Sequence, residues 1–123
     1  MVQEVAPQVV DVDERALQVF LKAIELVGGP RGLVEHRRLT WLPSLMEAAY
    51  AVVLREEAHK TTEEIAQFLG LSTNGTRLIL GASTENVQKR LEGETPENES
   101  TRAHVAGGLA KLAYQALKSE SSS

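Results

Sequence analysis

The sequence predicts an all-α protein, a compact helical domain of about six helices. Apolar residues recur every three to four positions through most of the chain, which is the period of an amphipathic helix. Glycine and proline stop these stretches at clear points, and no internal repeat divides the chain. The 123 residues match the usual size of one domain with its own core.

One helical domain is expected over residues 13–118. Residues 1–12 form an N-terminal arm, which is either frayed or a short extended segment, and residues 119–123 form a mobile C-terminal tail. Asp13 is expected to cap a first helix that runs to about Val27 and stops at Gly28-Gly29-Pro30.

A loop from Pro30 to Thr40 is expected next, and Pro43 then suits the first turn of a second helix. The apolar stripe predicted for that helix consists of Leu45, Met46, Ala49, Val52 and Val53.

The segment 61–80 carries the most specific local signals. Thr61 and Glu64 have the spacing of a capping box, which fixes a helix start. Gly70 suits the left-handed end of that helix, and Ser72 suits the N-cap of the next. Two short helices joined by a tight corner are therefore predicted.

Two further helices are expected toward the C-terminus. One begins at Ser83 or Thr84 and ends at Gly93, and the acidic, Pro-interrupted stretch 94–100 reads as a linker. The last helix is capped by Ser100 or Thr101, and its stripe consists of Val105, Leu109, Leu112, Ala113, Ala116 and Leu117. Gly107-Gly108 inside it implies a close helix approach, either within the domain or across a twofold dimer axis.

Composition excludes several function classes. The absence of cysteine rules out disulfides, thiolate metal sites and cysteine catalysis. Thirteen basic and seventeen acidic residues give a net charge of −4, which argues against a non-specific nucleic-acid coat but leaves room for a local patch. Aromatic residues make up only 4%, which disfavours a base-stacking surface for single strands.

No catalytic or cofactor site is predicted. His36, His59 and His104 lack metal-ligand spacing, and no Gly-rich phosphate loop or Ser-His-Asp set can be identified. We therefore expect a non-enzymatic protein without a cofactor. No apolar run approaches the ~18 residues of a spanning helix, and the N-terminus lacks signal-peptide features, so a cytoplasmic location without membrane contact is expected.

The run EEIAQFLGLS, with the residues that follow it, resembles the helix-turn-helix of bacterial and archaeal transcription regulators over about twenty residues. Such families place the second helix in the major groove of double-stranded DNA. The resemblance implies that Ser72 and Thr73 touch phosphates. It also implies that Asn74, Thr76 and Arg77 face base edges or the backbone.

Two residues depart from the family pattern. The second helix usually carries Val or Ile where this chain has Thr76, and Gly75 destabilises that helix by about 1 kcal/mol relative to Ala. Two ordinary packed helices remain the alternative. The same pair could then serve a protein-interaction or signalling adaptor that docks a partner such as an ATPase, a role that the charge of −4 also favours.

The runs ASTENVQKRLEGE and HVAGGLAKLAY are similar to a small family of regulatory domains encoded beside KaiC-like ATPases in archaea and thermophilic bacteria. This resemblance implies a regulatory role and supplies no catalytic residues.

Local charge gives the DNA hypothesis further candidates. Lys60, Lys89 and Arg90 are expected to contact phosphates, although Lys89 and Arg90 could equally be a solvated helix end. So few contacts bind weakly, so a dimer or fusion to a partner would be needed. A homodimer through the C-terminal helix is one such arrangement. A third role, sensing a small ligand, lacks a convergent polar cluster in the sequence.

Overall fold

A computed structural model describes residues 11–35, 41–85 and 99–122 of the chain, and in the last range the side chains of 103–120. These residues form six α-helices and no strand, which confirms the all-α prediction. The helices are α1 (Val12–Leu26), α2 (Gly29–Glu35), α3 (Leu42–Glu56), α4 (Thr62–Leu69), α5 (Thr73–Leu80) and α7 (Glu99–Ser122).

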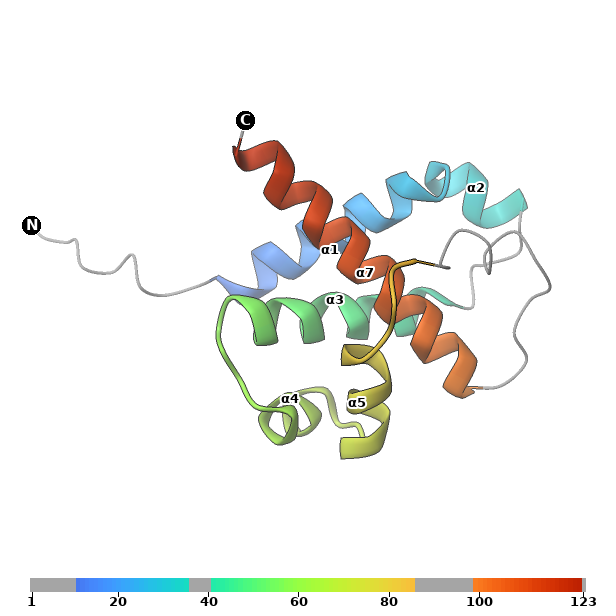
Figure 1. Ribbon diagram of the computed structural model, residues 1–123. Helices are drawn as coiled ribbons and strands as arrows, with labels where there is room; N and C mark the ends of the chain where they lie inside the picture. Colours follow the sequence, from blue (N-terminus) through green and yellow to red (C-terminus); the bar gives the residue numbers. More distant parts are fainter. Residues whose placement is uncertain (1–10, 36–40, 86–98, 123) are drawn as a thin grey trace, which may run out of the picture.

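Helices α1, α3 and α7 pack against one another and enclose the main core (Figure 1). The shorter α4 and α5 lie on the other side of α3 from α1, and α5 also packs against α7 (Figure 1). Each of these five helices contributes to one buried apolar cluster, whose members include Val19, Ala23, Leu45, Val53, Ile65, Ile79, Leu109 and Ala113.

The N-cap of helix α1 lies two residues before the predicted one. The side chain of Asp11, not Asp13, accepts the Glu14 N–H at 3.1 Å. Asp13 instead accepts a hydrogen bond from the Tyr50 hydroxyl of α3 at 2.6 Å. The predicted stop is confirmed, because Gly28 and Gly29 both adopt positive φ just after the helix.

The loop predicted from Pro30 onward is wrong over Gly29–Glu35, which forms α2. The positive φ of Gly29 redirects the chain, and Pro30 then starts a helix rather than only ending one. Gly32 packs so close to the carbonyl of Val27 that a Cβ could not fit, and Leu33 is buried beside it. The composition of this stretch does not reveal that Gly32 and Leu33 become buried.

Helix α3 has Pro43 in its first turn, as predicted. The expected stripe is buried except for Met46, which is 43% exposed and was wrongly included. Ala51 and Leu54 are buried as well, because α3 is covered by α1, α7, α4 and α5 on different sides.

Helix α7 is longer than predicted at both ends. It begins at Glu99 within the expected linker and continues to Ser122, so residues 119–122 of the expected mobile tail are helical. Lys22 of α1 pairs with Glu120, which ties this last part of α7 to α1.

Gly107 explains the small residues of α7. A Cβ there would lie 3.0 Å from the Ile79 Cα and closer still to the Ile79 carbonyl, a distance that real Cβ atoms essentially never show. The close approach is therefore made to α5 within the same chain. Ala106, Gly107 and Ala110 are buried, so this stripe is not open to a second copy.

The helix predicted from Ser83 or Thr84 lies outside the described residues beyond Glu85. Within the described ranges, no helix is long and apolar enough to cross a membrane.

Candidate functional site

The corner between α4 and α5 is built by the predicted local signals. Thr61 Oγ1 accepts the Glu64 N–H at 3.1 Å, and Glu64 Oε1 accepts the Thr61 N–H at 2.9 Å, which confirms the capping box. Gly70 is left-handed at φ 69° and ends α4. Ser72 Oγ accepts the Gly75 N–H at 2.9 Å and starts α5.

The inner faces of the two helices meet over small and branched side chains. Ile65, Ala66 and Ile79 are buried there. Thr76 is buried as well, with no exposed surface, and its hydroxyl donates to the Ser72 carbonyl at 3.0 Å. The expectation that Thr76 faces DNA is therefore wrong. Its hydroxyl is satisfied locally, which allows a threonine to occupy this buried position.

The outward side of α5 presents the other candidates from the resemblance. Ser72, Asn74 and Arg77 are exposed, and Thr73 is half-buried. Among the described residues, no carboxylate lies within ion-pair distance of Arg77. The guanidinium is thus available to an external group.

Lys60 lies where the chain turns from α3 to α4. His59 adopts φ 56°, a left-handed conformation that lets the Lys60 N–H donate to the Leu54 carbonyl at 2.9 Å and close α3. The Lys60 side chain is exposed. Lys89 and Arg90 lie outside the described residues.

Acidic side chains border this surface on α4. Glu64 is turned back to its own helix start, where the Thr61 N–H and, to a smaller extent, the Lys60 charge lower the pKa of its carboxyl group. Glu63 is exposed in the same turn. The acids of α4 therefore do not neutralise Arg77 directly.

An aromatic side chain also stands out on α4. Phe68 is 57% exposed, and its ring centroid lies 5.5 Å from that of Tyr50. Half of this large apolar side chain is left in contact with solvent.

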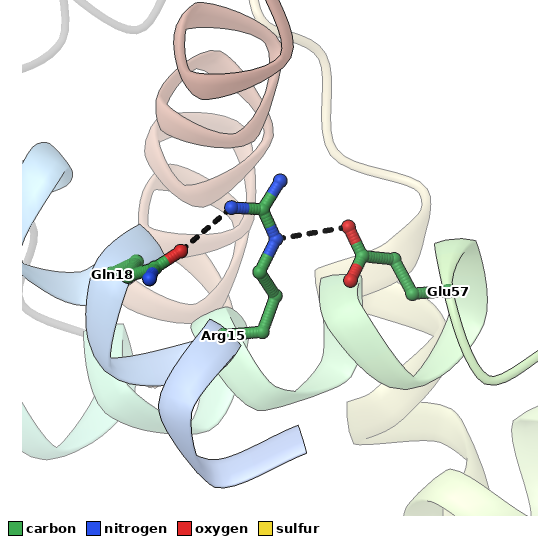
Figure 2. Close-up of polar contacts among 3 residues, drawn as sticks. All are labelled: Arg15, Gln18 and Glu57. Atoms are coloured by element: carbon green, nitrogen blue, oxygen red, sulfur yellow. Dashed lines mark hydrogen bonds and ion pairs between the residues drawn. The ribbon is translucent and has the colours of Figure 1, made fainter. Parts of the chain in front are cut away.

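The structure also brings together polar residues that the sequence reasoning missed. Arg15 of α1 lies between Gln18 and Glu57, with its Nε 3.0 Å from Glu57 Oε2 and its terminal nitrogen donating to Gln18 Oε1 at 2.7 Å (Figure 2). Tyr114 of α7 adds its ring, whose centroid lies 5.9 Å from the Arg15 guanidinium carbon.

A cleft between α3, α5 and α7 is a second missed feature. It is lined by Val52, Arg55, Glu56, Leu80, Lys111, Tyr114 and Gln115. The sequence suggested no convergent polar cluster, because Arg55 and Lys111 lie 56 positions apart and only the packing of α7 on α3 brings them to one cavity.

No group of three metal-binding side chains is found in the described parts of the chain. Comparisons with known protein families, with curated proteins and with solved structures find no match.

Proposed function

We propose that the α4–α5 pair binds double-stranded DNA and that the protein acts as a transcriptional regulator. The observation that carries the proposal is the exposed face of α5, where Asn74 and Arg77 stand beside a capped helix start and Arg77 has no ion-pair partner among the described residues.

The chemistry of this face suits DNA. Arginine and asparagine pair with guanine and adenine edges in the major groove. Ser72 and Thr73 flank the N-terminus of α5, where backbone N–H groups attract phosphate oxygens. Lys60 supplies a further phosphate contact, together with Lys89 and Arg90 in this proposal. In this proposal the role is binding rather than catalysis, and it is exercised in the cytoplasm.

Overall charge limits the affinity. The chain carries a net charge of −4, so the basic side chains near α5 must attract DNA despite the overall negative charge of the protein. A few phosphate contacts per chain make binding weak and salt-sensitive, and a second copy on an adjacent half-site would strengthen it. The small-residue stripe of α7 is buried, so such a dimer would use another surface.

The test measures binding to random duplex DNA at ~50 and ~200 mM salt. We expect salt-sensitive binding that Arg77→Ala weakens by about 1–3 kcal/mol. Arg31→Ala is the matched control, because Arg31 is 87% exposed on α2, on the other side of α3 from α4 (Figure 1). Absence of binding by folded protein at the lower salt contradicts the proposal, and an equal loss in both variants contradicts base contact by Arg77.

A protein-interaction module is the second candidate, and the exposed Phe68 favours it. Large aromatic side chains anchor protein interfaces, and the resemblance to domains encoded beside KaiC-like ATPases suggests such an ATPase as the partner. Phe68→Ala should then weaken binding to that purified ATPase at least tenfold. Leu17→Ala, which truncates an equally exposed side chain on α1, should leave it unchanged.

A further inference from the structure

The cleft between α3, α5 and α7 has the size of a small-molecule site. Its volume is about 400 Å³, and ligand pockets commonly span roughly 300–1,000 Å³. Val52 and Leu80 give it an apolar wall, while five polar side chains converge on the remainder.

Arg55 of α3 brings one cation to this cleft. Its terminal nitrogen donates to Thr62 Oγ1 at 2.6 Å, which orients the guanidinium. Its Nε is buried and has no hydrogen-bond partner. That atom has almost no accessible surface, so a molecule in the cleft cannot reach it. What Arg55 offers the cleft is its charge, which no carboxylate among the described residues pairs with.

Lys111 brings a second cation from α7. Its Nζ donates to the Ala82 carbonyl at 2.8 Å, and an ammonium group has two further N–H bonds to offer. Burial and the nearby Arg55 charge lower the pKa of Lys111, whereas Glu56 raises it. Two cations thus face one carboxylate in a partly desolvated cleft, and an added anion would relieve their repulsion.

The neighbouring groups are neutral hydrogen-bonding side chains. Burial, followed by a hydrogen bond to Glu57, raises the pKa of Tyr114 to about 12, so its hydroxyl stays protonated at neutral pH. Gln115 is exposed at the cleft and can donate or accept. Neither side chain adds negative charge.

We propose that this cleft binds a small anionic molecule, a carboxylate or phosphate compound, held by Arg55 and Lys111 against Val52 and Leu80. The proposal does not depend on DNA binding. Both cations also hold the ends of the α4–α5 pair, since Thr62 is the first residue of α4 and Ala82 follows α5 closely. An anion bound in the cleft should therefore perturb both Thr62 and Ala82.

The test is a titration of the full chain with pyrophosphate and, separately, with succinate, followed by amide NMR shifts. Sodium chloride at matched ionic strength is the blank. We expect saturable shifts at Thr62, Ala82 and residues of the cleft. The compound that binds with the lower dissociation constant shows whether the site prefers a phosphate or a carboxylate group. Arg55→Gln and Lys111→Gln should each weaken binding about tenfold.

Arg31→Gln removes an equivalent charge from exposed α2 and should leave the binding constant unchanged. Lys111→Gln keeps a donor for the Ala82 carbonyl, so it tests the site if Arg55→Gln fails to fold. The proposal is overturned if neither compound gives saturable shifts at the cleft, or if the Arg31 and Lys111 variants lose binding equally.

Discussion

At the scale of single residues, Gly107 shows how one missing side chain sets the distance between two helices. The backbone of Ile79 in α5 occupies the space that a Cβ of residue 107 would need. Because both partners are backbone, neither can rotate away. The glycine lowers the helix propensity of α7 but permits the contact that fixes α5 on the core.

Gly107→Ala should therefore destabilise the protein by about 1–3 kcal/mol, even though alanine favours the helix by about 1 kcal/mol. Urea unfolding followed by circular dichroism measures this change. Gly75→Ala is the contrasting variant, since its Cβ would meet only the side-chain hydroxyl of Ser72 at 3.1 Å, and we expect a much smaller change in stability than at Gly107. Equal stability of the wild type and the Gly107 variant would contradict the close approach.

Tyr114 gives a second prediction at this scale. Its raised pKa of about 12 means that the folded state favours the protonated phenol. The associated stability is complete below the unfolded pKa of about 10 and is lost as the pH rises from there toward 12.

The variant Tyr50→Phe leaves Tyr114 as the only tyrosine, so its phenolate absorbance can be followed alone. The folded variant should titrate near pH 12 and the urea-denatured variant near about 10. Circular dichroism at each pH shows whether the helices persist. If Tyr114 titrates at the same pH in the folded and the denatured variant, its ring does not lie in the buried environment described above.

At the scale of elements, the boundaries of α4 and α5 follow from neighbouring residues. The Thr61–Glu64 capping box, the left-handed Gly70 and the Ser72 cap were all predicted and are all present. Each of these signals acts within four residues, so the sequence contains the whole interaction.

The α4 cap should make stability depend on pH in the acid range. Because the pKa of Glu64 is lowered in the folded state, its contribution is present above the unfolded value of about 4.3 and is lost as the pH falls through the folded value. Glu64→Gln should therefore be less stable than wild type at neutral pH, and the difference should shrink below pH of about 4.

Glu63→Gln is the control for this measurement. Glu63 is exposed in the same turn and forms no hydrogen bond or ion pair with the described residues. Its substitution should not give the same pH-dependent difference in unfolding free energy. If the difference in unfolding free energy between wild type and Glu64→Gln stays constant across the acid range, the capping hydrogen bond of Glu64 is not its source.

Helix α2 shows where element prediction fails. Its seven residues contain two glycines and a proline, which is a loop composition by local rules. In the structure Gly32 packs against the carbonyl of Val27, just past the end of α1, and Leu33 is buried, and neither fact follows from the loop-like composition.

At the scale of the whole molecule, Arg15 and Glu57 connect three helices. Arg15 belongs to α1 and Glu57 caps α3 (Figure 2). Tyr114 of α7 lies against both. The two charged side chains are only 22% and 21% exposed, so solvent screens their ion pair less than a surface pair.

A double-mutant cycle with Arg15→Met and Glu57→Gln should give a coupling of about 1 kcal/mol in unfolding free energy. The exposed Arg31–Glu35 pair, at 4.0 Å, should give only about 0.3 kcal/mol in the same experiment. Equal couplings would mean that the Arg15 contact contributes no more than a surface pair.

The sequence by itself determined the helical class, the capped corner between α4 and α5, and the exposed candidates Ser72, Asn74 and Arg77. These follow from helical periodicity and from bonds between residues a few positions apart. Only the tertiary structure decided that Thr76 is buried, that Gly107 serves α5 rather than a second copy, and that Arg55 and Lys111 share a cleft. These outcomes depend on contacts between distant helices, which only the packed core establishes.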